Sequence, residues 1–339
     1  MIGAALAGFH SLADLRPEEV RDLLALASRL QRHPEPRALA GKILGLLFFD
    51  PSLRTLASMQ AGMARLGGTS VVLTPGRGTW ALETRTGVVM DGEAAEHVRE
   101  AIPVLAGYVD VLGIRAFAGG KDLAADLADA TFRAMVEVSP VPTINLESAL
   151  DHPCQALGDW KTLDDLGVPE RGKLVLSWAH HPKPLPLAVP AAVVHSAAAR
   201  GMEVVVLRPE AYALPAPVLA RAREAAACSG GSVVETADRA EALSGAVALY
   251  AKSWASPAHY GDAAAESALR AGLAAWRVDL DWFSGAHPAC RFFHCLPVRR
   301  NVVVSDAVLD SPRSAVIPQA HNRMWAQMAV LHRLLGGPR

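Results

Sequence analysis

Disulfide scaffolds and strong net charge are both missing from this 339-residue sequence. Its four cysteines, Cys154, Cys228, Cys290 and Cys295, form no CxxC pair. A chain of this length can bury a core without disulfide bonds, so no disulfide framework is expected. Lys and Arg together number 33, Asp and Glu 34, and the formal net charge is -1. There is therefore no global field that would recruit nucleic acid or an anionic membrane surface, and any anion site must be local.

Long hydrophobic runs are also missing. The longest apolar stretch, roughly residues 185–200, is interrupted by Pro186, Pro190 and His195, and it is shorter than the about 20 residues that span a membrane. The first residues have no basic segment ahead of their short apolar stretch, and Asp14 follows soon after, unlike an export signal. We expect no transmembrane helix and a cytoplasmic protein.

The sequence contains no sign of a bound cofactor. No GxGxxG fingerprint follows a predicted strand, so a nicotinamide dinucleotide site is not supported. Four clustered residues, His287, Cys290, His294 and Cys295, are candidate metal ligands. No second ligand pair at zinc-like spacing accompanies them, so we predict neither a metal nor a cofactor.

What the sequence does contain is an alternation of short apolar runs with alanine-rich amphipathic stretches. Such an alternation predicts an α/β fold with two doubly wound parallel-sheet domains. The predicted strands are residues 43–49, 70–74, 109–115, 143–146, 173–178, 203–207, 246–251 and 291–295. The predicted helices include residues 56–66, 94–108, 190–200, 217–228, 263–275 and about 322–335.

Polar residues follow several of these strands. The strand at 43–49 runs into Asp50-Pro51-Ser52-Leu53-Arg54-Thr55 and then a helix, where a helix N-terminus favours an anion. An ordinary Ser or Thr helix cap is the alternative reading. Arg115, His152 and Gln155, and the segment His294-Cys295-Leu296-Pro297 follow other strands. Open α/β sheets bind ligands at such strand ends, so these residues predict a shared site.

Three of these segments resemble the signatures of the aspartate and ornithine carbamoyltransferases: Ser-x-Arg-Thr at 52–55, His-Pro-x-Gln at 152–155 and His-Cys-Leu-Pro at 294–297. Their order and spacing match along nearly the whole chain. The resemblance implies a carbamoyl-phosphate domain at 1–150 and an acceptor domain at 151–321, with the final helix, about 322–335, packing back on the first domain. It also implies a homotrimer in which neighbouring subunits share active sites.

The same resemblance assigns roles at the carbamoyl-phosphate end. Thr55, Arg115 and His152 would polarise the carbamoyl oxygen, and Gln155 with the main-chain carbonyls at Cys295 and Leu296 would hold the carbamoyl amine. The residues implied for phosphate or carbamoyl binding are Ser52, Leu53, Arg54, Thr55, Trp80 of a neighbouring subunit, Arg115, His152, Pro153, Cys154, Gln155, Cys295, Leu296 and Arg323. Of these, Arg54, Thr55, Arg115, His152 and Gln155 are the candidate catalytic residues. No covalent intermediate is expected.

Several of these residues also have plainer alternative roles. Trp80 could be a core residue and Arg323 a surface residue of a helix. His152 could be a hydrogen-bonded structural histidine, and Cys295 an inert buried thiol. Arg54 belongs to a segment that departs from many family members, which have a second arginine and then Ser-Phe-Glu where this chain has Leu56 and Ser-Met-Gln.

That departure motivates a non-catalytic, ligand-binding relative as a competing hypothesis. Retention of the basic and amide groups that face the carbamoyl carbon speaks against it. We therefore expect an enzyme in which the neutral δ-amine of the acceptor attacks directly. The departing phosphate is a candidate acceptor for the proton.

The acceptor end lacks the aspartate and Ser-Met-Gly loop that grip free ornithine. Lys252, in LYAKSW, could instead pair with the α-carboxylate of an ornithine whose α-amine is acylated and uncharged. The segment resembles that of the N-acetylornithine and N-succinylornithine carbamoyltransferases, which implies that Glu147, His181, Lys252 and Arg299 contact the acceptor. The alternatives are a surface carboxylate for Glu147, His180 in place of its neighbour, and a solvated basic pair at 299–300.

Two positions predict which acyl group is preferred. Family members specific for the acetyl group carry a glutamate where this chain has Ala95, and a lysine where it has Val303. A glutamate reaching into the neighbour's acceptor site would repel a succinyl tail, and Ala95 removes that like-charge penalty. Arg299 would be free to pair with the terminal carboxylate of the succinyl group. N-succinyl-L-ornithine is therefore the expected acceptor, in arginine biosynthesis, and N-acetyl-L-ornithine is the alternative.

Overall fold

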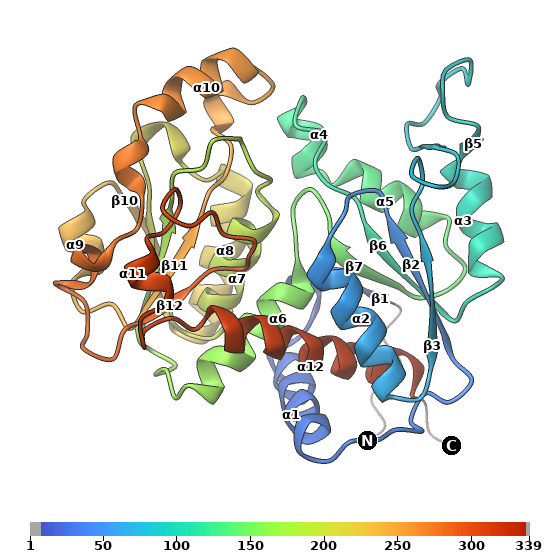
Figure 1. The fold of residues 1–339 in the computed structure, drawn as a ribbon, viewed down its shortest axis with the longest axis horizontal. Coiled ribbons are helices and arrows are strands. Elements are labelled where there is room, and N and C mark those ends of the chain that lie inside the picture. The colour runs from blue at the N-terminus through green and yellow to red at the C-terminus, as the bar shows by residue number, and fades with distance from the viewer. Residues whose placement is uncertain (1–7, 337–339) are drawn as a thin grey trace. The chain divides into compact units, whose positions relative to one another are not determined.

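The computed structural model describes residues 8–336 and divides them into two compact units (Figure 1). The first unit comprises residues 8–119, 124–154 and 323–336, and the second comprises residues 120–123 and 155–322. Each unit is built around its own five-stranded sheet. Residues 1–7, which begin the N-terminal apolar stretch considered for an export signal, lie outside the described residues.

The sheet of the first unit is parallel throughout and has the strand order β1-β7-β6-β2-β3. Strands β2 and β6 lie next to each other with Phe48 opposite Arg115, and β6 and β7 end with Arg115 opposite Glu147. Their carboxyl ends therefore meet at one edge of the sheet. The strands are β1 (Gly8–Phe9), β2 (Ile43–Phe48), β3 (Thr69–Leu73), β6 (Val111–Arg115) and β7 (Thr143–Glu147).

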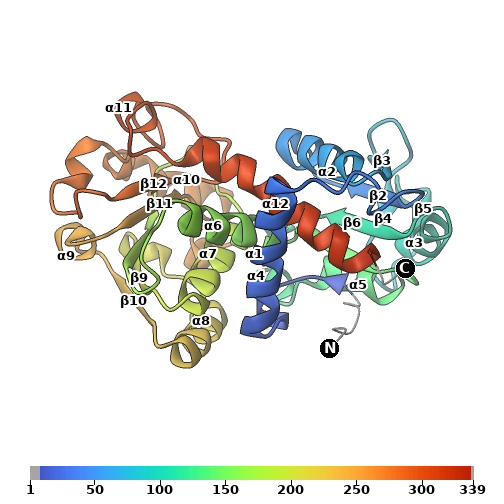
Figure 2. The ribbon, with the colours of Figure 1, turned by 90° about the horizontal axis from the view of Figure 1, so that it is seen from below.

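Helices cover both faces of this sheet. Figure 2 shows α2 and α5 on opposite faces. Side chains of α3 and α5 pack with Leu47, Leu112 and Ile114 of the strands in one buried apolar cluster. The helices are α1 (Pro17–Arg32), α2 (Leu53–Arg65), α3 (Val98–Ala106), α4 (Leu123–Leu127) and α5 (Ala130–Glu137), with a 3-10 turn η1 (Leu12–Asp14). Two short paired strands, β4 (Leu82–Glu83) and β5 (Glu96–His97), lie outside the main sheet.

The second unit repeats the architecture with the strand order β10-β9-β8-β11-β12, again all parallel. Its central strands are almost completely buried, as is typical of parallel sheets covered on both faces. The strands are β8 (Lys173–Trp178), β9 (Glu203–Leu207), β10 (Ser232–Thr236), β11 (Ala248–Lys252) and β12 (Arg291–Phe293).

The helices of the second unit are α7 (Ala188–Ala199), α8 (Ala216–Ser229), α9 (Arg239–Leu243), α10 (Ala263–Ala271) and α11 (Asp306–Leu309). Four 3-10 turns accompany them, η2 (Glu210–Tyr212), η3 (Pro257–His259), η4 (Ala274–Trp276) and η5 (Leu280–Phe283). Gly230 caps the end of helix α8, and its φ of 79° is the left-handed conformation that glycine adopts without a steric penalty. Two further helices, α6 (Pro153–Asp165) and α12 (Val316–Leu335), have residues in both units.

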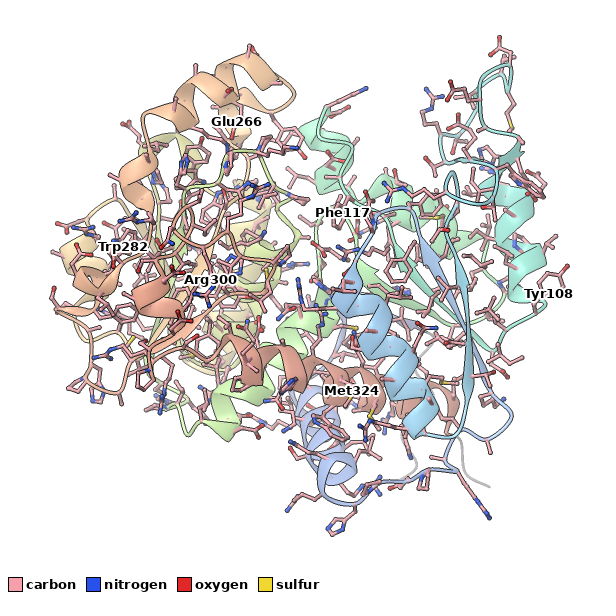
Figure 3. All side chains as sticks on the ribbon, viewed as in Figure 1. Tyr108, Phe117, Glu266, Trp282, Arg300 and Met324 are labelled. Carbon is pink, nitrogen blue, oxygen red and sulfur yellow. The ribbon has the colours of Figure 1, made fainter. Side chains whose placement is uncertain are left out.

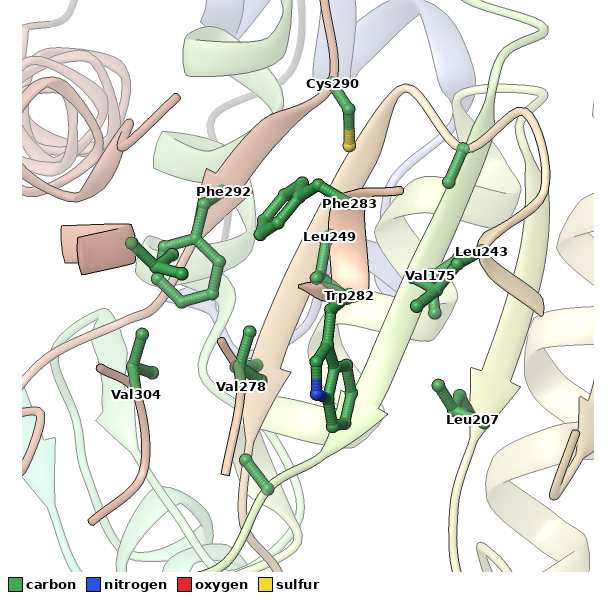
Figure 4. Packing of buried hydrophobic residues seen from close by; sticks show 14 of the residues in the cluster. Val175, Leu207, Leu243, Leu249, Val278, Trp282, Phe283, Cys290, Phe292 and Val304 are labelled. Carbon is green, nitrogen blue, oxygen red and sulfur yellow. The ribbon is translucent and has the colours of Figure 1, made fainter. Parts of the chain in front are cut away.

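An apolar core fills one side of the second sheet. Figure 4 shows Trp282 and Phe283 packed against Leu249, Val175 and Phe292. Val303, at the position where acetyl-specific relatives are expected to have lysine, is 2% exposed and belongs to this cluster. The residue is therefore part of the core, where a charged side chain would be costly to bury.

The predicted fold class is confirmed: two α/β units with parallel sheets. The predicted strands 173–178 and 203–207 match the observed strands residue for residue. Strands β1 and β10 were not predicted. The strand predicted at 291–295 ends at Phe293, and the helix predicted from about residue 322 begins at Val316. Within residues 8–336, no helix is long and apolar enough to cross a membrane.

Candidate active site

Helix α2 begins at the segment that follows β2. Ser52 is its N-cap: its Oγ accepts a hydrogen bond from the Thr55 amide at 3.2 Å and its hydroxyl donates to Thr55 Oγ1 at 2.9 Å. Thr55 is fully buried, whereas Leu53 is 82% exposed. The helix-cap reading is thus correct for Ser52, and it is compatible with anion binding because the first turn of a helix presents amide N–H groups.

Arg115 and Glu147 meet at the ends of β6 and β7. Arg115 Nη1 lies 2.5 Å from Glu147 Oε2, and the two side chains are 7% and 12% exposed. His152 Nε2 is 3.6 Å from the same carboxylate oxygen. The guanidinium of Arg115 also stacks on Phe117 at 4.4 Å. Glu147 is therefore not a surface carboxylate, and the structure groups it with two residues predicted to face the carbamoyl group.

Backbone strain accompanies this cluster. Glu147 has a φ of 147°, in the region that side-chain-bearing residues rarely adopt. Its amide is held by Asn145 Oδ1 at 3.0 Å, and its carbonyl accepts from the Ala116 amide at 3.0 Å. Strained residues of this kind concentrate at functional sites, because surrounding contacts must enforce the conformation.

The loop that leads to His152 is fixed by residues that the sequence analysis did not identify. Asp129 accepts hydrogen bonds from the Ser148 hydroxyl at 2.6 Å and the Ala149 amide at 3.1 Å. Burial raises the pKa of the Asp129 carboxyl. Asp151 accepts from the Ser11 hydroxyl at 2.6 Å and from the His152 amide at 2.8 Å. His152 itself is 2% exposed.

The start of α6 and the first-unit part of α12 carry two further predicted site residues. Burial raises the pKa of the Cys154 thiol to about 12, although the positive charge of Arg323 opposes the shift. A thiol with such a pKa stays protonated near neutral pH and is a poor nucleophile. Arg323 is 4% exposed, so the surface-residue reading of this arginine is wrong. Pro153 is the first residue of α6.

Trp80 lies on an exposed loop, so the core-packing reading of this residue is wrong. It is 62% exposed, and its indole N–H donates to Glu96 Oε2 at 2.8 Å. The loop is held by the β4–β5 pairing and by a hydrogen bond from the Ala95 amide to the Ala81 carbonyl at 3.2 Å. Ala95 is exposed directly beside Glu96. The loop therefore presents Trp80 and Ala95 at the surface of the first unit.

Basic residues gather at the carboxyl ends of the second sheet. Lys252 ends β11 opposite Trp178, the last residue of β8, and His181 follows β8 three residues later. Burial lowers the pKa of His181, and the charges of Lys252 and Arg299 lower it further. His181 is therefore neutral near pH 7 and stands in a positive environment. Three of the four predicted acceptor contacts thus influence one another electrostatically.

A buried arginine that the sequence analysis missed fixes the loops around these residues. Arg270 of α10 is 2% exposed and donates to the carbonyls of His181 at 3.0 Å and Trp254 at 2.7 Å. It also donates to Ser253 Oγ at 2.9 Å. Its charge is balanced by Glu266, one helical turn earlier and labelled in Figure 3, at 2.6 Å. Arg270 therefore joins the segment after β8 to the segment after β11.

The His294–Pro297 segment leaves the sheet after β12. Leu296 has a φ of 57° and is followed by a cis peptide bond to Pro297. Its amide donates to His294 Nδ1 at 2.9 Å. Cys295 is buried. Gln155, on α6, donates from its amide nitrogen to Asp159 Oδ1 at 2.7 Å. Within residues 8–336, no group of three or more His, Cys, Asp or Glu side chains is arranged to hold a metal ion.

The two arginines after this segment have different surroundings. Arg300, labelled in Figure 3, pairs with Asp306 and Asp310 at 2.7 Å each. Arg299 is exposed, and its carbonyl accepts from the Val303 amide at 2.9 Å. Both arginines are exposed, which agrees with the reading of a solvated basic pair, but Arg300 also anchors the loop to α11 through its ion pairs.

Comparison with known protein families identifies the type of reaction for the residues at these strand ends. A family model for the aspartate/ornithine carbamoyltransferase carbamoyl-P binding domain matches residues 8–165. A second model, for the Asp/Orn binding domain of the same family, matches residues 189–334. The chain belongs to the aspartate/ornithine carbamoyltransferase family. It is a carbamoyltransferase, and the family predicted from the three sequence signatures is confirmed.

Members with different acceptors are similar to this chain. The N-acetylornithine carbamoyltransferase of Xanthomonas campestris is 38% identical, over 99% of each chain. The N-succinylornithine carbamoyltransferase of Bacteroides thetaiotaomicron is also 38% identical, over 87% of this chain and 88% of that one. The crystal structure of an acetylornithine transcarbamylase complexed with acetylcitrulline superposes with a TM-score of 0.94 and 38% identity, over 97% of this chain and 99% of that one.

Proposed function

We propose that this protein transfers the carbamoyl group of carbamoyl phosphate to the δ-amine of N-succinyl-L-ornithine, giving N-succinyl-L-citrulline and phosphate in arginine biosynthesis. The observation that carries the choice of acceptor is Ala95, a small uncharged residue on the exposed loop that also presents Trp80. The choice of donor rests on the family and on the polar groups at the ends of β2, β6 and β7.

Carbamoyl phosphate is the donor, and its phosphate is a dianion that needs local positive charge. We assign its binding to Ser52, Leu53, Arg54 and Thr55 at the start of α2, with Arg115 and Arg323. The N-terminal turn of α2 supports this role, because amide N–H groups and the helix dipole both favour an anion there. Arginine adds paired charge-assisted hydrogen bonds to phosphate oxygens.

The chemical step that we infer is direct attack of the neutral δ-amine on the carbamoyl carbon. A C–N bond forms, negative charge grows on the carbamoyl oxygen, and the bond from carbon to the phosphate oxygen then breaks. Thr55, Arg115 and His152 are the donors assigned to that oxygen. All three are buried, so they stabilise the developing charge in a site with little competing water. Loss of one such donor costs roughly 3 kcal/mol of transition-state stabilisation.

The acceptor is assigned to Lys252, His181 and Arg299 of the second unit, together with Glu147. A positive environment suits a substrate with carboxylates and no α-ammonium group. Lys252 would pair with the α-carboxylate. Arg299, exposed beside the anchored Arg300, would pair with the terminal carboxylate of the succinyl group. Glu147 would accept a hydrogen bond from the acceptor's nitrogen.

Ala95 supports a succinyl rather than an acetyl group. A carboxylate at this position would face the terminal carboxylate of a succinylated acceptor, and two like charges in a partly desolvated site repel strongly. Among the similar solved structures is an N-acetyl-L-ornithine transcarbamylase variant in which one glutamate is replaced by alanine, complexed with carbamyl phosphate and N-succinyl-L-norvaline. That complex supports the idea that alanine makes room for the longer acyl group.

N-acetyl-L-ornithine is the second candidate acceptor. It is favoured by the 38% identity to the Xanthomonas campestris enzyme over 99% of this chain. The chemistry of transfer would be the same. The two candidates differ only in whether the acyl group carries a carboxylate, so the charge at residue 95 separates them.

We further propose a homotrimer with shared active sites. Trp80 and Ala95 would then complete the site of a neighbouring subunit. Their exposure, on a loop held by β4 and β5, supports a role outside the core of their own chain. Glu96, which accepts the Trp80 indole hydrogen bond, would orient the ring before assembly.

The test is citrulline-type product formation from carbamoyl phosphate with each of four acceptors: N-succinyl-L-ornithine, N-acetyl-L-ornithine, L-ornithine and L-aspartate. The wild-type protein should give its highest kcat/KM with N-succinyl-L-ornithine. Ala95→Glu should lower that value by about 10- to 100-fold, because it restores like-charge repulsion, and should spare N-acetyl-L-ornithine. Ala94→Glu adds the same charge one residue away and is the matched control.

Each outcome separates one part of the proposal. A preference for N-acetyl-L-ornithine would retain the reaction and refute the succinyl assignment. An equal loss with both acylornithines in Ala95→Glu would refute the charge argument. A wild-type protein that is folded but inactive with all four acceptors would favour the non-catalytic relative suggested by the unusual Leu56 and Ser58-Met59-Gln60 segment of α2.

A further inference from the structure

A buried carboxylate that the proposed reaction does not use lies behind Gln155. Asp159 is one helical turn further along α6 and is 5% exposed. Its Oδ1 accepts two hydrogen bonds at 2.7 Å, one from Gln155 Nε2 and one from Gln319 Nε2 of α12. Buried carboxylates are costly unless they are hydrogen-bonded, so the position of Asp159 is well determined by these two amides.

Gln319 connects this carboxylate to the segment after β12. It is fully buried, and its Oε1 accepts the backbone N–H of His294 at 3.0 Å. Its Nε2 also donates to the hydroxyl of Tyr250 at 3.1 Å. Burial, followed by the charge of Asp159, raises the pKa of the Tyr250 phenol well above its usual range. The Tyr250 hydroxyl therefore stays protonated near neutral pH.

The network determines which end of the Gln155 amide is presented to a ligand. A carboxylate can only accept hydrogen bonds, so the atom of Gln155 that faces Asp159 must be the nitrogen. The amide oxygen then points to the other side. An oxygen is the group that recognises an N–H donor, whereas the reversed amide would present its own N–H. Gln319 also holds the segment whose carbonyls at residues 295–296 are the other proposed acceptors for the carbamoyl amine.

We propose that Asp159 and Gln319 are positioning residues that make the site select the NH2 end of carbamoyl phosphate. They act through Gln155 and through the His294–Leu296 segment, not by contact with the substrate. This inference rests on the proposed function, because it assumes that Gln155 holds the carbamoyl amine. It predicts discrimination between carbamoyl phosphate and acetyl phosphate, which has a methyl group where carbamoyl phosphate has NH2.

Asp159→Asn replaces a carboxylate, which can only accept hydrogen bonds, with an amide that can also donate. The variant therefore no longer enforces the orientation of Gln155, and it keeps the side-chain shape. We expect the KM for carbamoyl phosphate to rise about tenfold, corresponding to one hydrogen bond of about 1.4 kcal/mol. The inhibition constant of acetyl phosphate should change by less than about twofold, because a methyl group makes no hydrogen bond. Gln319→Met removes the hydrogen bonds to both Asp159 and the His294 amide. It should likewise raise the KM for carbamoyl phosphate relative to the inhibition constant of acetyl phosphate.

The matched control is Asp165→Asn, the same substitution on the same helix. Asp165 pairs with Lys161 at 2.7 Å and accepts from Asn322 at 2.9 Å. Asp165 makes no hydrogen bond to Gln155 in this network. A general weakening of α6 would therefore appear in Asp165→Asn without a change in the ratio of carbamoyl phosphate to acetyl phosphate affinity. Thermal unfolding identifies variants that do not fold, and Tyr250→Phe then provides the same comparison with the loss of a single hydroxyl.

The wild-type protein is measured first, as the intact chain. If it does not use carbamoyl phosphate, the proposed function is wrong. If it does, and the folded variants keep the wild-type ratio of carbamoyl phosphate to acetyl phosphate affinity, the positioning role is refuted. Equal weakening of both ligands would also refute it, because that is the result of a purely structural network.

Discussion

Arg115 and Glu147 form a buried ion pair at the ends of neighbouring strands. Their separation of 2.5 Å depends on the pairing of β6 with β7, where a register shift between Ile114 and Arg115 brings the two residues opposite each other. Breaking such a pair by removing one partner leaves an uncompensated buried charge, which commonly costs about 3–5 kcal/mol. The pair therefore orients Arg115 and also constrains which substitutions at this position are informative.

Arg115→Lys keeps the charge that Glu147 requires but removes the planar fork of donors. We expect kcat/KM for carbamoyl phosphate to fall by about 100-fold, because a donor to the developing oxyanion is lost or displaced. Arg200→Lys is the control. Arg200 is another buried arginine, paired with Asp164 at 2.8 Å and bonded to the Val168 carbonyl at 2.6 Å. Arg200→Lys should lower the free energy of unfolding in chemical denaturation without a comparable effect on kcat/KM. Equal losses of kcat/KM in both variants would contradict the assignment of Arg115 to the carbamoyl oxygen.

Trp80 allows the shared site to be tested by mixing variants. Trp80→Phe removes the indole N–H, and Arg54→Ala removes a proposed phosphate ligand, so each variant alone should have little activity. If the two residues act in different subunits, dissociating and reassembling an equal mixture should restore about a quarter of the wild-type activity, because every hybrid trimer contains one intact site. Sedimentation should show trimers. No recovery from reassembled hybrids would place both residues in one subunit's site.

His195 predicts a pH dependence of stability in the second unit. Burial in α7 lowers its pKa from 6.5 to about 4, and the charge of Arg221 adds to the shift. Below pH 6.5 the unfolded chain gains a proton that the folded chain resists. Stability is therefore complete above pH 6.5 and decreases as the pH falls towards about 4. At pH 5 the loss from this residue alone is about 2 kcal/mol.

His195→Gln should remove this part of the pH dependence. The measurement is the free energy of unfolding in urea at pH 7 and pH 5, and the quantity of interest is the difference between the two. The control is His33→Gln, at an exposed position after α1. A variant that loses as much stability as the wild-type protein between the two pH values would show that other groups cause the acid sensitivity.

Local sequence patterns predicted much of the fold. The strands at 173–178 and 203–207 were predicted to the residue, because apolar runs bounded by breakers report directly on buried strands. The positions of residues 52–55 and of Arg115 at the ends of β2 and β6 were predicted for the same reason. Strand β1, with two residues, is too short to produce a pattern, and the exposed residues in β10 weaken its apolar signal.

The supporting residues could not be predicted in this way. Arg270 holds the carbonyl of His181 from 89 residues away, and Gln319 bonds to Asp159 across 160 residues. A buried arginine or glutamine has the same local sequence context as an exposed one. Only packing decides that such a side chain is buried, and its burial then forces it to find partners.

By itself, the sequence determined the α/β class, the order of the strands along the chain and the three signature segments that identify a carbamoyltransferase, because these depend on local periodicity and on residue identity. The tertiary structure decided that Glu147 pairs with Arg115, that Trp80 is exposed and bonded to Glu96, and that Arg323 is buried. Those facts depend on strand register and on packing between distant segments, which a linear pattern does not encode.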